Sequence, residues 1–512
     1  MSSELNLNWP LQIGQQSIRL HPDDNLVVAR LDIVAGTVID GGLVSAGPVR
    51  AGHKIASQAI AIGDPLRKAG QIIGYAASAL SAGAPIHNGD FQVDAQVLDP
   101  LAPAAVTRAA QQASFQGYLR ADGRVGTRNY LGVLIVGNCA ATAARNVADW
   151  FTLQRLEAWP NVDGVIPFIH EIGCGMEMTG EPMDLLRRTL SGCVRNPNMA
   201  GALVLALGCE RNNIYGFLEQ EKLTVGADFK TLVLQEVGGT ASAISQGIAA
   251  IETMLPAANE VVRQTVSAAH LSVGLQSAAV DGFCALSANP ALGVAMNRLV
   301  ACGGTVIVSD TGDLAALGSD MLPRAANPVV AEALQQILDE SVRYQQGRDT
   351  ALNRRILGDR EAKGLSTVRE RALAGLSRAG NTPIQAVYGY AHPIRAKGVV
   401  VMDAPNYEAV SATGQVASGA TFICMTTGSG SGFGAAMAPT LKLASTSAVY
   451  RSMQDDLDID CGPVLDALLS VEQMGEQIFA RILAHASGEQ TCSEQLGVGE
   501  NEFVPWPKGV LA

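Results

Sequence analysis

Two arginines stand four residues apart, shortly before an apolar run in the first third of the chain. Arg124 and Arg128 precede residues 131–136, a run that is too short for a helix and is followed by glycine, so it predicts a buried strand. The chain then turns at Gly137-Asn138-Cys139. Cationic side chains before a strand and backbone N–H groups after it suit a small anion. An ordinary α/β unit with surface arginines is the alternative interpretation.

The same pattern of strand and polar loop recurs between residues 115 and 320. The apolar runs are 132–136, 164–168, 202–207, 232–234, 272–275 and 305–308. The polar residues that follow them include His170, Glu210, Gln235, Glu236 and Asp281. Helical stretches lie between the runs, which predicts parallel strands joined by crossovers. Since the carboxyl ends of parallel strands meet at one edge of a sheet, these side chains would line a single cleft.

Three segments differ in pattern and predict three domains. Residues 1–100 hold short β-type runs between glycine-rich turns and predict an all-β module. Residues 101–365 hold the strand–loop–helix units and most of a charged, helix-prone connector, and residues 366–512 begin a further α/β unit. That last unit contains the glycine-rich stretch TTGSGSGFG at 426–434. It lacks the lysine of a P-loop and the spacing of a dinucleotide fingerprint, so we do not expect it to bind a nucleotide.

Composition restricts the classes of partner. The 512 residues are 48% hydrophobic and carry a net charge of −12, which disfavours a nucleic-acid partner. The start has neither the basic nor the apolar region of a signal peptide, and no stretch approaches the ~20 apolar residues of a membrane span. Nine scattered cysteines fit a reducing compartment, so we expect a cytoplasmic protein without a membrane partner.

Many short motifs, in order along the chain, resemble those of the altronate/galactarate dehydratase family. The matching stretches are DGRVGTRN at 122–129, NVDGV at 161–165, His170, GCG at 173–175, LGCE at 207–210, QEVGGT at 235–240, SANPALG at 287–293, SATGQ at 411–415, TTG at 426–428, Lys442 and DIDCG at 458–462. Residues 21–25 and 52–54 are similar to the family's N-terminal SAF (β-clip) module. The resemblance implies that SAF module followed by two α/β units with largely parallel, Rossmann-like sheets.

Four stretches depart from the family pattern. Relatives typically carry Cys-Gly-Gly-Ser-Asp where this chain has Ser277-Ala278-Ala279-Val280-Asp281, so only the aspartate is retained. The arginine of the family's TTGRG is Ser429 here. The other two departures are Pro85-Ile86-His87-Asn88 in place of His-Thr-His-Asn, and Gly434-Ala435-Ala436-Met437 in place of Gly-Cys-Lys-Pro. These changes bear on the substrate and on whether activity is retained.

The resemblance implies β-elimination of water from a sugar acid, which gives a 2-keto-3-deoxy acid. That reaction needs a cation to stabilise the enolate, a base for the α-proton and an acid for the departing hydroxyl. Arg124 and Arg128 are candidates for a carboxylate clamp, because arginine presents a planar fork; a salt-bridged strand start is the alternative. His170 is the candidate acid or base, with a structural histidine as the alternative.

Other family positions suggest further roles. Glu210 and Glu236 would be a base, a metal ligand or helix caps, and Asp281 is a candidate catalytic carboxylate. The matched motifs imply substrate contacts from a set of polar residues: Asn138, Gln235, Asn289, Thr426, Thr427 and Lys442.

The resemblance also implies a divalent metal, Fe²⁺ or Mn²⁺. The candidate N and O ligands are His21, Asp24, His53 and His87, with surface or turn roles as the alternative. Cys139, Cys174 and Cys209 each follow a strand, so an iron–sulfur cluster is conceivable. We do not expect one, because a small buried residue is the commonest use of cysteine.

The leading hypothesis is thus a metal-dependent hydro-lyase acting on an aldonate or aldarate, as a homodimer. A C–S lyase acting on a sulfolactate-like hydroxy acid shares the α-proton step and is the second hypothesis. A sugar-acid-binding protein with an altered site is the third.

Overall fold

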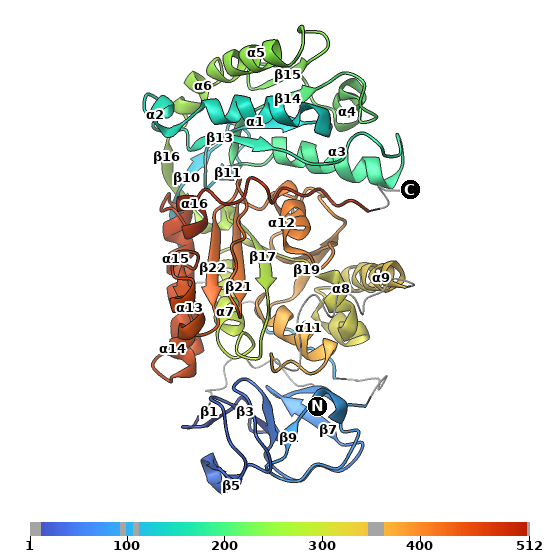
Figure 1. Ribbon diagram of the computed structural model, residues 1–512, viewed down its shortest axis with the longest axis vertical. Coiled ribbons are helices and arrows are strands. Elements are labelled where there is room, and N and C mark those ends of the chain that lie inside the picture. The colour runs from blue at the N-terminus through green and yellow to red at the C-terminus, as the bar shows by residue number, and fades with distance from the viewer. Residues whose placement is uncertain (1–11, 93–98, 106–111, 347–362, 509–512) are drawn as a thin grey trace.

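The computed structural model describes residues 12–92, 99–105, 112–346 and 363–508. The molecule is elongated and has three tiers (Figure 1). The N-terminal module lies at one end, a seven-stranded sheet with its helices occupies the middle, and a four-stranded sheet with its helices forms the other end. Within the described residues, no helix is both long and apolar enough to cross a membrane.

The N-terminal module is built from short strands, as the sequence predicts. A five-stranded antiparallel sheet has the order β1-β2-β3-β6-β9, and the pairs β4–β5 and β7–β8 form separate hairpins. The strands are β1 (Gln12–Ile13), β2 (Ser17–Arg19), β3 (Leu26–Ala29), β4 (Val38–Ile39), β5 (Leu43–Val44), β6 (Lys54–Ala56), β7 (Pro65–Lys68), β8 (Gln71–Tyr75) and β9 (Pro85–Ile86). Short 3₁₀ turns cover Asp40–Gly42 and Asn88–Asp90.

The central unit contains a parallel sheet in the order β13-β12-β14-β15. Its strands are β12 (Tyr130–Ile135), β13 (Gly164–Phe168), β14 (Met199–Ala206) and β15 (Phe229–Val233). Its helices are α1 (Ala141–Trp150), α2 (Leu153–Leu156), α3 (Glu181–Val194), α4 (Ile214–Glu221), α5 (Thr240–Glu252) and α6 (Leu255–Glu260), with a 3₁₀ turn at Asn138–Ala140. Alternate residues of β12 serve opposite faces: Leu131 and Val133 pack with α1 and α5, whereas Leu134 packs with α3 and α4.

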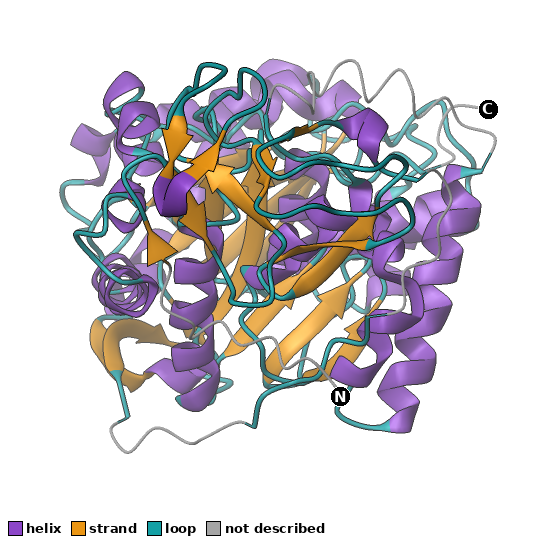
Figure 2. Cartoon of the chain, turned by 90° about the horizontal axis from the view of Figure 1, so that it is seen from below, coloured by secondary structure: helices purple, strands orange, loops and turns teal. Residues whose placement is uncertain are grey.

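The C-terminal domain contains a seven-stranded parallel sheet in the order β19-β20-β18-β17-β21-β22-β23. Its strands are β17 (Ser272–Ala278), β18 (Thr305–Val308), β19 (Ile384–Tyr388), β20 (Gly398–Met402), β21 (Phe422–Thr427), β22 (Thr440–Ala444) and β23 (Ile459–Asp460). Figure 2 shows the strands of this sheet with helices on both sides. On one face α7 (Ala288–Ala301) and α15 (Val471–Ala486) pack together; on the other, α12 (Glu408–Ala417) packs against α3 of the central unit.

The remaining elements connect these layers. They are β10 (Ser114–Leu119), β11 (Val125–Gly126) and β16 (Arg263–Ser267), which form a three-stranded antiparallel sheet; α8 (Thr311–Leu314), α9 (Pro328–Gln345), α11 (Val368–Ser377), α13 (Ser447–Ser452), α14 (Gly462–Leu465) and α16 (Cys492–Gln495); and 3₁₀ turns at Ala268–His270 and Ala315–Arg324. The chain after α16 runs back to the central unit, where the ring of Phe503 meets that of Phe168 at a centroid distance of 5.2 Å.

The sheet pairing corrects one predicted domain boundary. Strands β17 and β18 pair directly with β21 and β20, so residues on both sides of position 365 share one sheet. A boundary at 365 was predicted because the charged connector looks like a linker in sequence. The connector's described parts, α9 and α11, instead pack beside the sheet as part of the same domain. The all-β module and the parallel sheets are as predicted, whereas the Rossmann-like classification stays a prediction.

Candidate active site

The carboxyl edge of the seven-stranded sheet has a switch point between β17 and β21. The chain goes from β17 to β18 on one side of it, and later resumes on the other side with β21. In open α/β sheets, ligands bind at such a point, outside the carboxyl ends of the strands. The two loops that begin there are 279–283, after β17, and 428–434, after β21. This edge points toward the N-terminal module (Figure 1).

Asp281 lies in the first of these loops. Its carboxylate accepts a hydrogen bond from the backbone N–H of Cys284 at 2.7 Å and one from the hydroxyl of Ser445 at 3.4 Å. Partial burial raises the pKa of Asp281, although these hydrogen bonds oppose the shift. A Cβ atom on Gly428 would lie 2.5 Å from Cγ of Asp281, so only glycine fits at this position of the second loop. Ala279 has φ +48°, a strained conformation of the kind that gathers at functional sites.

Three other predicted residues surround the same edge. Lys442 is buried on β22, donates to the backbone carbonyl of Ser431 at 3.0 Å, and has its pKa lowered by burial. Thr427 is buried at the end of β21, and its hydroxyl accepts from the N–H of Ser429 at 3.4 Å. The buried hydroxyl oxygen of Thr426 has no hydrogen-bond partner within the described part of the chain. The structure therefore brings Asp281 and Thr427 to neighbouring strand ends, and Lys442, in the middle of β22, reaches the loop after β21.

The N-terminal module contributes a cavity of about 490 Å³. His53, His87, Arg50 and Asp32 provide its titratable and cationic lining together with Lys54. His53 is buried and His87 is exposed. Sequence reasoning missed Arg50 and Asp32, because neither belongs to a motif and only the folding of the module places them beside the histidines.

The loop that carries His53 touches the loop that carries Asp281. A Cβ atom on Gly282 would lie 2.5 Å from the carbonyl oxygen of Gly52, and one on Gly364 would also collide with that oxygen. Such close backbone approach requires glycine at both positions. The close contact between Gly52 and Gly282 thus joins the N-terminal module to the sheet edge. Each of these glycines is the direct neighbour of a candidate residue, His53 and Asp281.

A buried charge cluster fixes the module on the sheet domain. The ammonium groups of Lys54 and Lys68 contact the carboxylate of Glu370 at 3.0 and 2.7 Å, and all three side chains are buried. The two lysines lower the pKa of Glu370 to about 2, whereas burial lowers the pKa of Lys54 to about 8. Lys54 also donates to the carbonyl of Gly364 at 2.7 Å.

The four predicted metal ligands separate into two places. The buried Asp24 carboxylate accepts the backbone N–H groups of His21, Ala69 and Gly70, and Nδ1 of His21 accepts that of Asp23. His21 and Asp24 thus organise a turn, and only the two other histidines line the cavity. Across the described chain, no three His, Cys, Asp or Glu side chains are already arranged around one metal position. The imidazole nitrogens of His53 and His87 and the carboxylate of Asp32 are nonetheless donors of the kind that Fe²⁺ or Mn²⁺ accepts.

The predicted residues of the central unit lie at the opposite end of the molecule. His170 is 3% exposed, its Nε2 donates to the carbonyl of Ile135 at 2.9 Å, and burial lowers its pKa to about 4. Glu210 accepts the N–H groups of Leu207 and Gly208, which secures its own loop.

Three more polar residues surround that end. Asn138 and Gln235 are exposed at the same edge as His170 and Glu210, and Glu236 accepts the hydroxyl of Tyr215 at 2.7 Å. The catalytic and substrate-binding roles of this group stay predictions.

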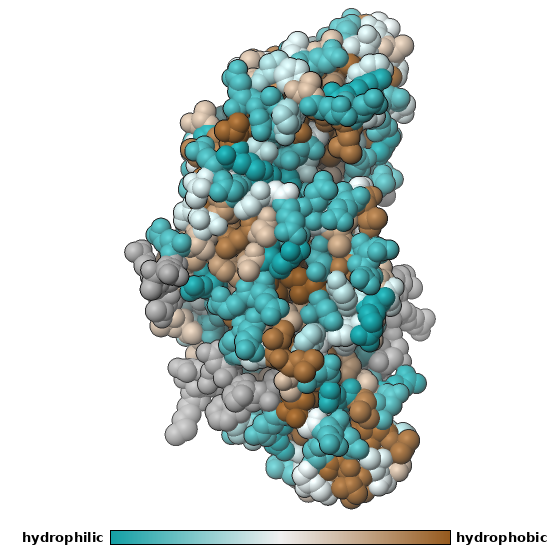
Figure 3. All heavy atoms as spheres, turned by 90° about the vertical axis from the view of Figure 1, so that its left-hand side faces the viewer, coloured by the Kyte–Doolittle hydropathy of each residue, from teal (hydrophilic) through white to brown (hydrophobic). Residues whose placement is uncertain are grey.

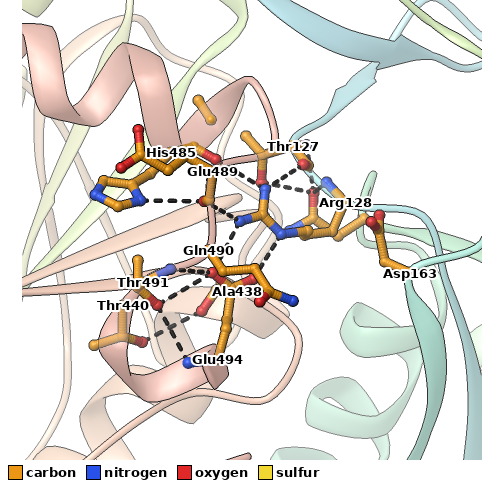
Figure 4. A network of polar contacts seen from close by, with 12 residues as sticks. Thr127, Arg128, Asp163, Ala438, Thr440, His485, Glu489, Gln490, Thr491 and Glu494 are labelled. Carbon is orange, nitrogen blue, oxygen red and sulfur yellow. Dashed lines mark hydrogen bonds and ion pairs between the residues drawn. The ribbon is translucent and has the colours of Figure 1, made fainter. Parts of the chain in front are cut away.

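Arg128 makes structural contacts, contrary to the predicted clamp. Its five N–H groups donate to Glu494 twice and to the carbonyls of Thr127, His485 and Glu489 (Figure 4). This arrangement leaves no donor for a substrate carboxylate and joins the start of β12 to the end of α15.

Two further candidates are also in structural contacts. Arg124 is exposed, pairs with Asp122, and donates to the carbonyl of Arg195. The salt-bridged alternative therefore describes both arginines. Asn289 is buried in the first turn of α7 and donates to the carbonyl of Ala374 at 2.8 Å, so it holds α11.

Three family models match consecutive parts of the chain. The altronate/galactarate dehydratase SAF domain matches residues 15–93, the second domain of D-galactarate dehydratase/altronate hydrolase matches 117–259, and the D-galactarate/altronate dehydratase C-terminal domain matches 268–511. The matched segments agree with the module, the central unit and the sheet domain of the structure.

The chain belongs to the altronate/galactarate dehydratase family. It is 26% identical over 493 residues to altronate dehydratase of Bacillus subtilis, an alignment that covers 95% of this chain and 97% of that one. It is 29% identical over 509 residues to galactarate dehydratase (L-threo-forming) of Escherichia coli, with 94% and 95% covered. It is 27% identical over 397 residues to (2R)-sulfolactate sulfo-lyase subunit beta of Chromohalobacter salexigens, with 76% and 96% covered. Family membership indicates a hydro-lyase, in agreement with the predicted enzyme class.

The departures from the family motifs fall in two different environments. Ser277–Val280 and Ser429 lie at the β17/β21 switch point beside Asp281, where a change of side chain alters the candidate site. The Gly434–Met437 loop instead packs against the central unit, where Met437 is buried and its carbonyl accepts from Asn198 at 2.8 Å. That loop lines a small, mostly apolar cavity with Phe168 and Phe503. The loss of Cys and Lys there is a change in domain packing.

Proposed function

We propose that this protein removes water from a sugar acid, an aldonate or aldarate, at the junction between the N-terminal module and the carboxyl edge of the seven-stranded sheet. The observation that carries the proposal is the position of Asp281: a half-buried carboxylate at a sheet switch point, next to the loop that bears His53. The family assignment supports the same reaction class, since relatives of this length are named altronate and galactarate dehydratases.

Asp281 is the proposed base for the α-proton. A raised pKa makes a carboxylate a stronger base near neutral pH, where the protonation state and the driving force for proton transfer are best balanced. Its two hydrogen bonds hold the carboxylate in one orientation, and the backbone of Gly428 packs closely against it. The protonated Asp281 then gives this proton to the β-hydroxyl, which departs as water, and the enol product tautomerises to a 2-keto-3-deoxy acid.

Arg50 is the proposed partner of the substrate carboxylate. It lines the cavity of the N-terminal module and is exposed, so its guanidinium is open to a ligand in a way that the enclosed Arg128 is not. If a divalent metal binds, His53 and His87 are the residues that would hold it. The ion would supply positive charge to the developing enolate.

A substrate panel tests the reaction class. The full chain is incubated with Fe²⁺ or Mn²⁺ and a set of aldonates, aldarates and sulfolactate, and 2-keto-3-deoxy acid and sulfite are assayed separately. Keto-acid formation from at least one sugar acid is expected. Sulfite from sulfolactate would instead support the C–S lyase hypothesis, which the similarity to the sulfo-lyase subunit favours. Binding of a sugar acid without product would show an altered, inactive site.

A further inference from the structure

Three cysteines meet at the switch point of the central sheet, far from the proposed active site. In the order β13-β12-β14-β15, the chain leaves β12 for β13 on one side and resumes with β14 on the other. Cys139, Cys174 and Cys209 lie in the loops that follow β12, β13 and β14. We call these three residues the thiol cluster. A sheet of this kind binds its ligands at this edge.

The exposure of these cysteines differs from that of the others. Cys139 and Cys209 are exposed and Cys174 is half-buried, whereas five of the other six are buried: Cys193, Cys284, Cys302, Cys424 and Cys461. The Sγ atoms of Cys139 and Cys174 are 3.7 Å apart. Burial raises the pKa of the Cys174 thiol, and Cys139, Glu210 and Cys209 lie near enough to raise it further. The use of cysteine as a small buried residue therefore does not describe this cluster.

The loops of the thiol cluster interlock in a way that fixes the backbone that carries the three cysteines. A Cβ atom on Gly137 would lie 2.7 Å from Cγ of Glu210 and 3.6 Å from Sγ of Cys174, and one on Gly173 would collide with the carbonyl of Val136. The Glu210 carboxylate fixes the loop before Cys209 through two backbone N–H groups. Rigid support of this kind is what orients metal ligands.

Asn212 adds a further constraint on the same loops. Its side chain donates to the carbonyl of Val136 at 2.9 Å, and its backbone N–H donates to that of Gly173 at 2.9 Å. Asn212 is buried, so both bonds are shielded from water. The loops that carry all three cysteines are thus joined to one another independently of any disulfide.

The separation of the two sulfur atoms is that of two thiols in contact, and it is compatible with a shared metal but not with a disulfide. Two thiolates on one tetrahedral ion, with metal–sulfur bonds of about 2.3 Å, lie about 3.8 Å apart. A disulfide would bring them to about 2.0 Å. The observed 3.7 Å agrees with the first arrangement.

We propose that Cys139, Cys174 and Cys209 bind a thiophilic metal centre, either a single ion such as Zn²⁺ or Fe²⁺ or an iron–sulfur cluster. The described side chains do not already surround one metal position, so the exposed Cys209 completes the set by rotating its side chain. Soft thiolates select zinc, iron and cobalt over magnesium and manganese. The exposed side of the thiol cluster leaves a coordination position for water or a ligand. This centre is separate from the N and O donors of the active-site cavity and does not depend on the proposed function.

Metal content of the full-length protein tests the proposal. The protein is purified without oxygen, and iron, zinc and acid-labile sulfide are measured per chain; the metal-free form is titrated with Co²⁺, whose thiolate complexes have a charge-transfer absorption. We expect about one centre per chain. Cys139→Ser, Cys174→Ser and Cys209→Ser should each weaken Co²⁺ binding at least tenfold, since loss of a mere supporting group costs 10–100-fold. Cys492→Ser, a half-buried cysteine on α16, is the matched control and should bind normally.

Alkylation of the wild-type protein provides a readout that needs no variant. Cys139 and Cys209 should react with iodoacetamide in the metal-free protein and be protected, by tenfold or more in rate, when Co²⁺ or Zn²⁺ is bound. Absence of metal and of protection would overturn the proposal. So would undiminished thiolate–Co²⁺ absorption in the triple serine variant, or a Cys139–Cys174 disulfide in the protein purified without oxygen.

Discussion

Individual side chains decide where the chemistry can occur. Asp281 is held by two hydrogen bonds at a switch point and has a raised pKa, while Arg128 donates all of its N–H groups to other parts of the chain. From the sequence the two residues look equally suited to catalysis. The structure distinguishes their roles. Glu494, the ion-pair partner of Arg128, lies 366 positions away in the sequence, so no local motif could predict the pair.

The pH dependence of turnover follows from the pKa of Asp281. A general base must be deprotonated, so kcat/KM should fall as the pH drops through the pKa of the free enzyme's base. Because burial raises that pKa, the acidic limb is expected above the ordinary range of an aspartic acid side chain. A pH–rate profile of the wild-type enzyme measures it. An acidic limb at or below that ordinary range would exclude Asp281 as the titrating base.

Arg128→Lys should act on stability. Lysine keeps the charge but cannot replace five donors in a planar fork, so the free energy of unfolding should fall by about 2–4 kcal/mol, the scale of charged hydrogen bonds lost from a buried site. Denaturant unfolding measures the change, and turnover of the folded fraction should remain within a few-fold of wild type. Arg124→Lys is the matched control and should change stability by about 0.5 kcal/mol or less, because Arg124 is exposed. Normal stability with lost turnover in Arg128→Lys would instead support the hypothesis that Arg128 binds the substrate carboxylate.

At the scale of elements, the sequence predicted strands well and their long-range pairing poorly. The predicted runs at 164–168 and 305–308 coincide with β13 and β18. Periodicity and flanking glycines are local signals, and the predicted runs locate the ends of these strands within three residues. The pairing of β17 with β21 joins segments about 150 residues apart, and the predicted boundary at 365 fell inside that sheet.

The same limit applies to the candidate site. Motif order identified Asp281, Thr427 and Lys442, which the fold does bring together. It could not show that Asn289 is in the core or that His21 and Asp24 serve a turn, since their buried surroundings come from distant segments. Arg50 carries no sequence signal at all, because its place beside His53 depends on the fold of the module.

The docking of the N-terminal module depends on the buried Lys54–Glu370–Lys68 cluster. Glu370→Gln would leave two buried ammonium groups without a counter-charge, so a loss of about 3–5 kcal/mol in the free energy of unfolding is expected. Denaturant titration measures this loss. Glu332→Gln, on the N-terminal half of α9, is the control and should be near neutral, because Glu332 is exposed to solvent.

The same cluster predicts an acid dependence. The folded-state pKa of Glu370 is about 2 against an ordinary 4.5, so its stabilisation is complete above pH 4.5 and is lost as the pH falls toward 2. Wild type should therefore lose stability over that range more steeply than Glu370→Gln. Parallel acid-unfolding curves for the two proteins would contradict the assignment.

At the scale of the whole molecule, the two sheet edges that could bind a ligand lie at opposite ends. The β17/β21 edge faces the N-terminal module, while the thiol cluster and His170 belong to the central unit beyond the sheet domain.

The N-terminal module also exposes large hydrophobic side chains, among them Val34, Val38 and Ile62, and Figure 3 shows hydrophobic side chains gathered at that end. The predicted dimer and the cytoplasmic location stay predictions.

Turnover of two variants locates the active site most directly. With the substrate that the panel identifies, kcat and melting temperature are measured for wild type, Asp281→Asn and His170→Asn. If the chemistry occurs at the junction, Asp281→Asn should lose about 10²–10⁴-fold in kcat with little change in melting temperature, the usual size of an acid–base contribution. His170→Asn should keep kcat within about tenfold of wild type and lose melting temperature instead, because His170 is buried and bonded to a backbone carbonyl. Near-normal turnover in Asp281→Asn, together with a large loss in a stably folded His170→Asn, would place the chemistry at the opposite end of the molecule.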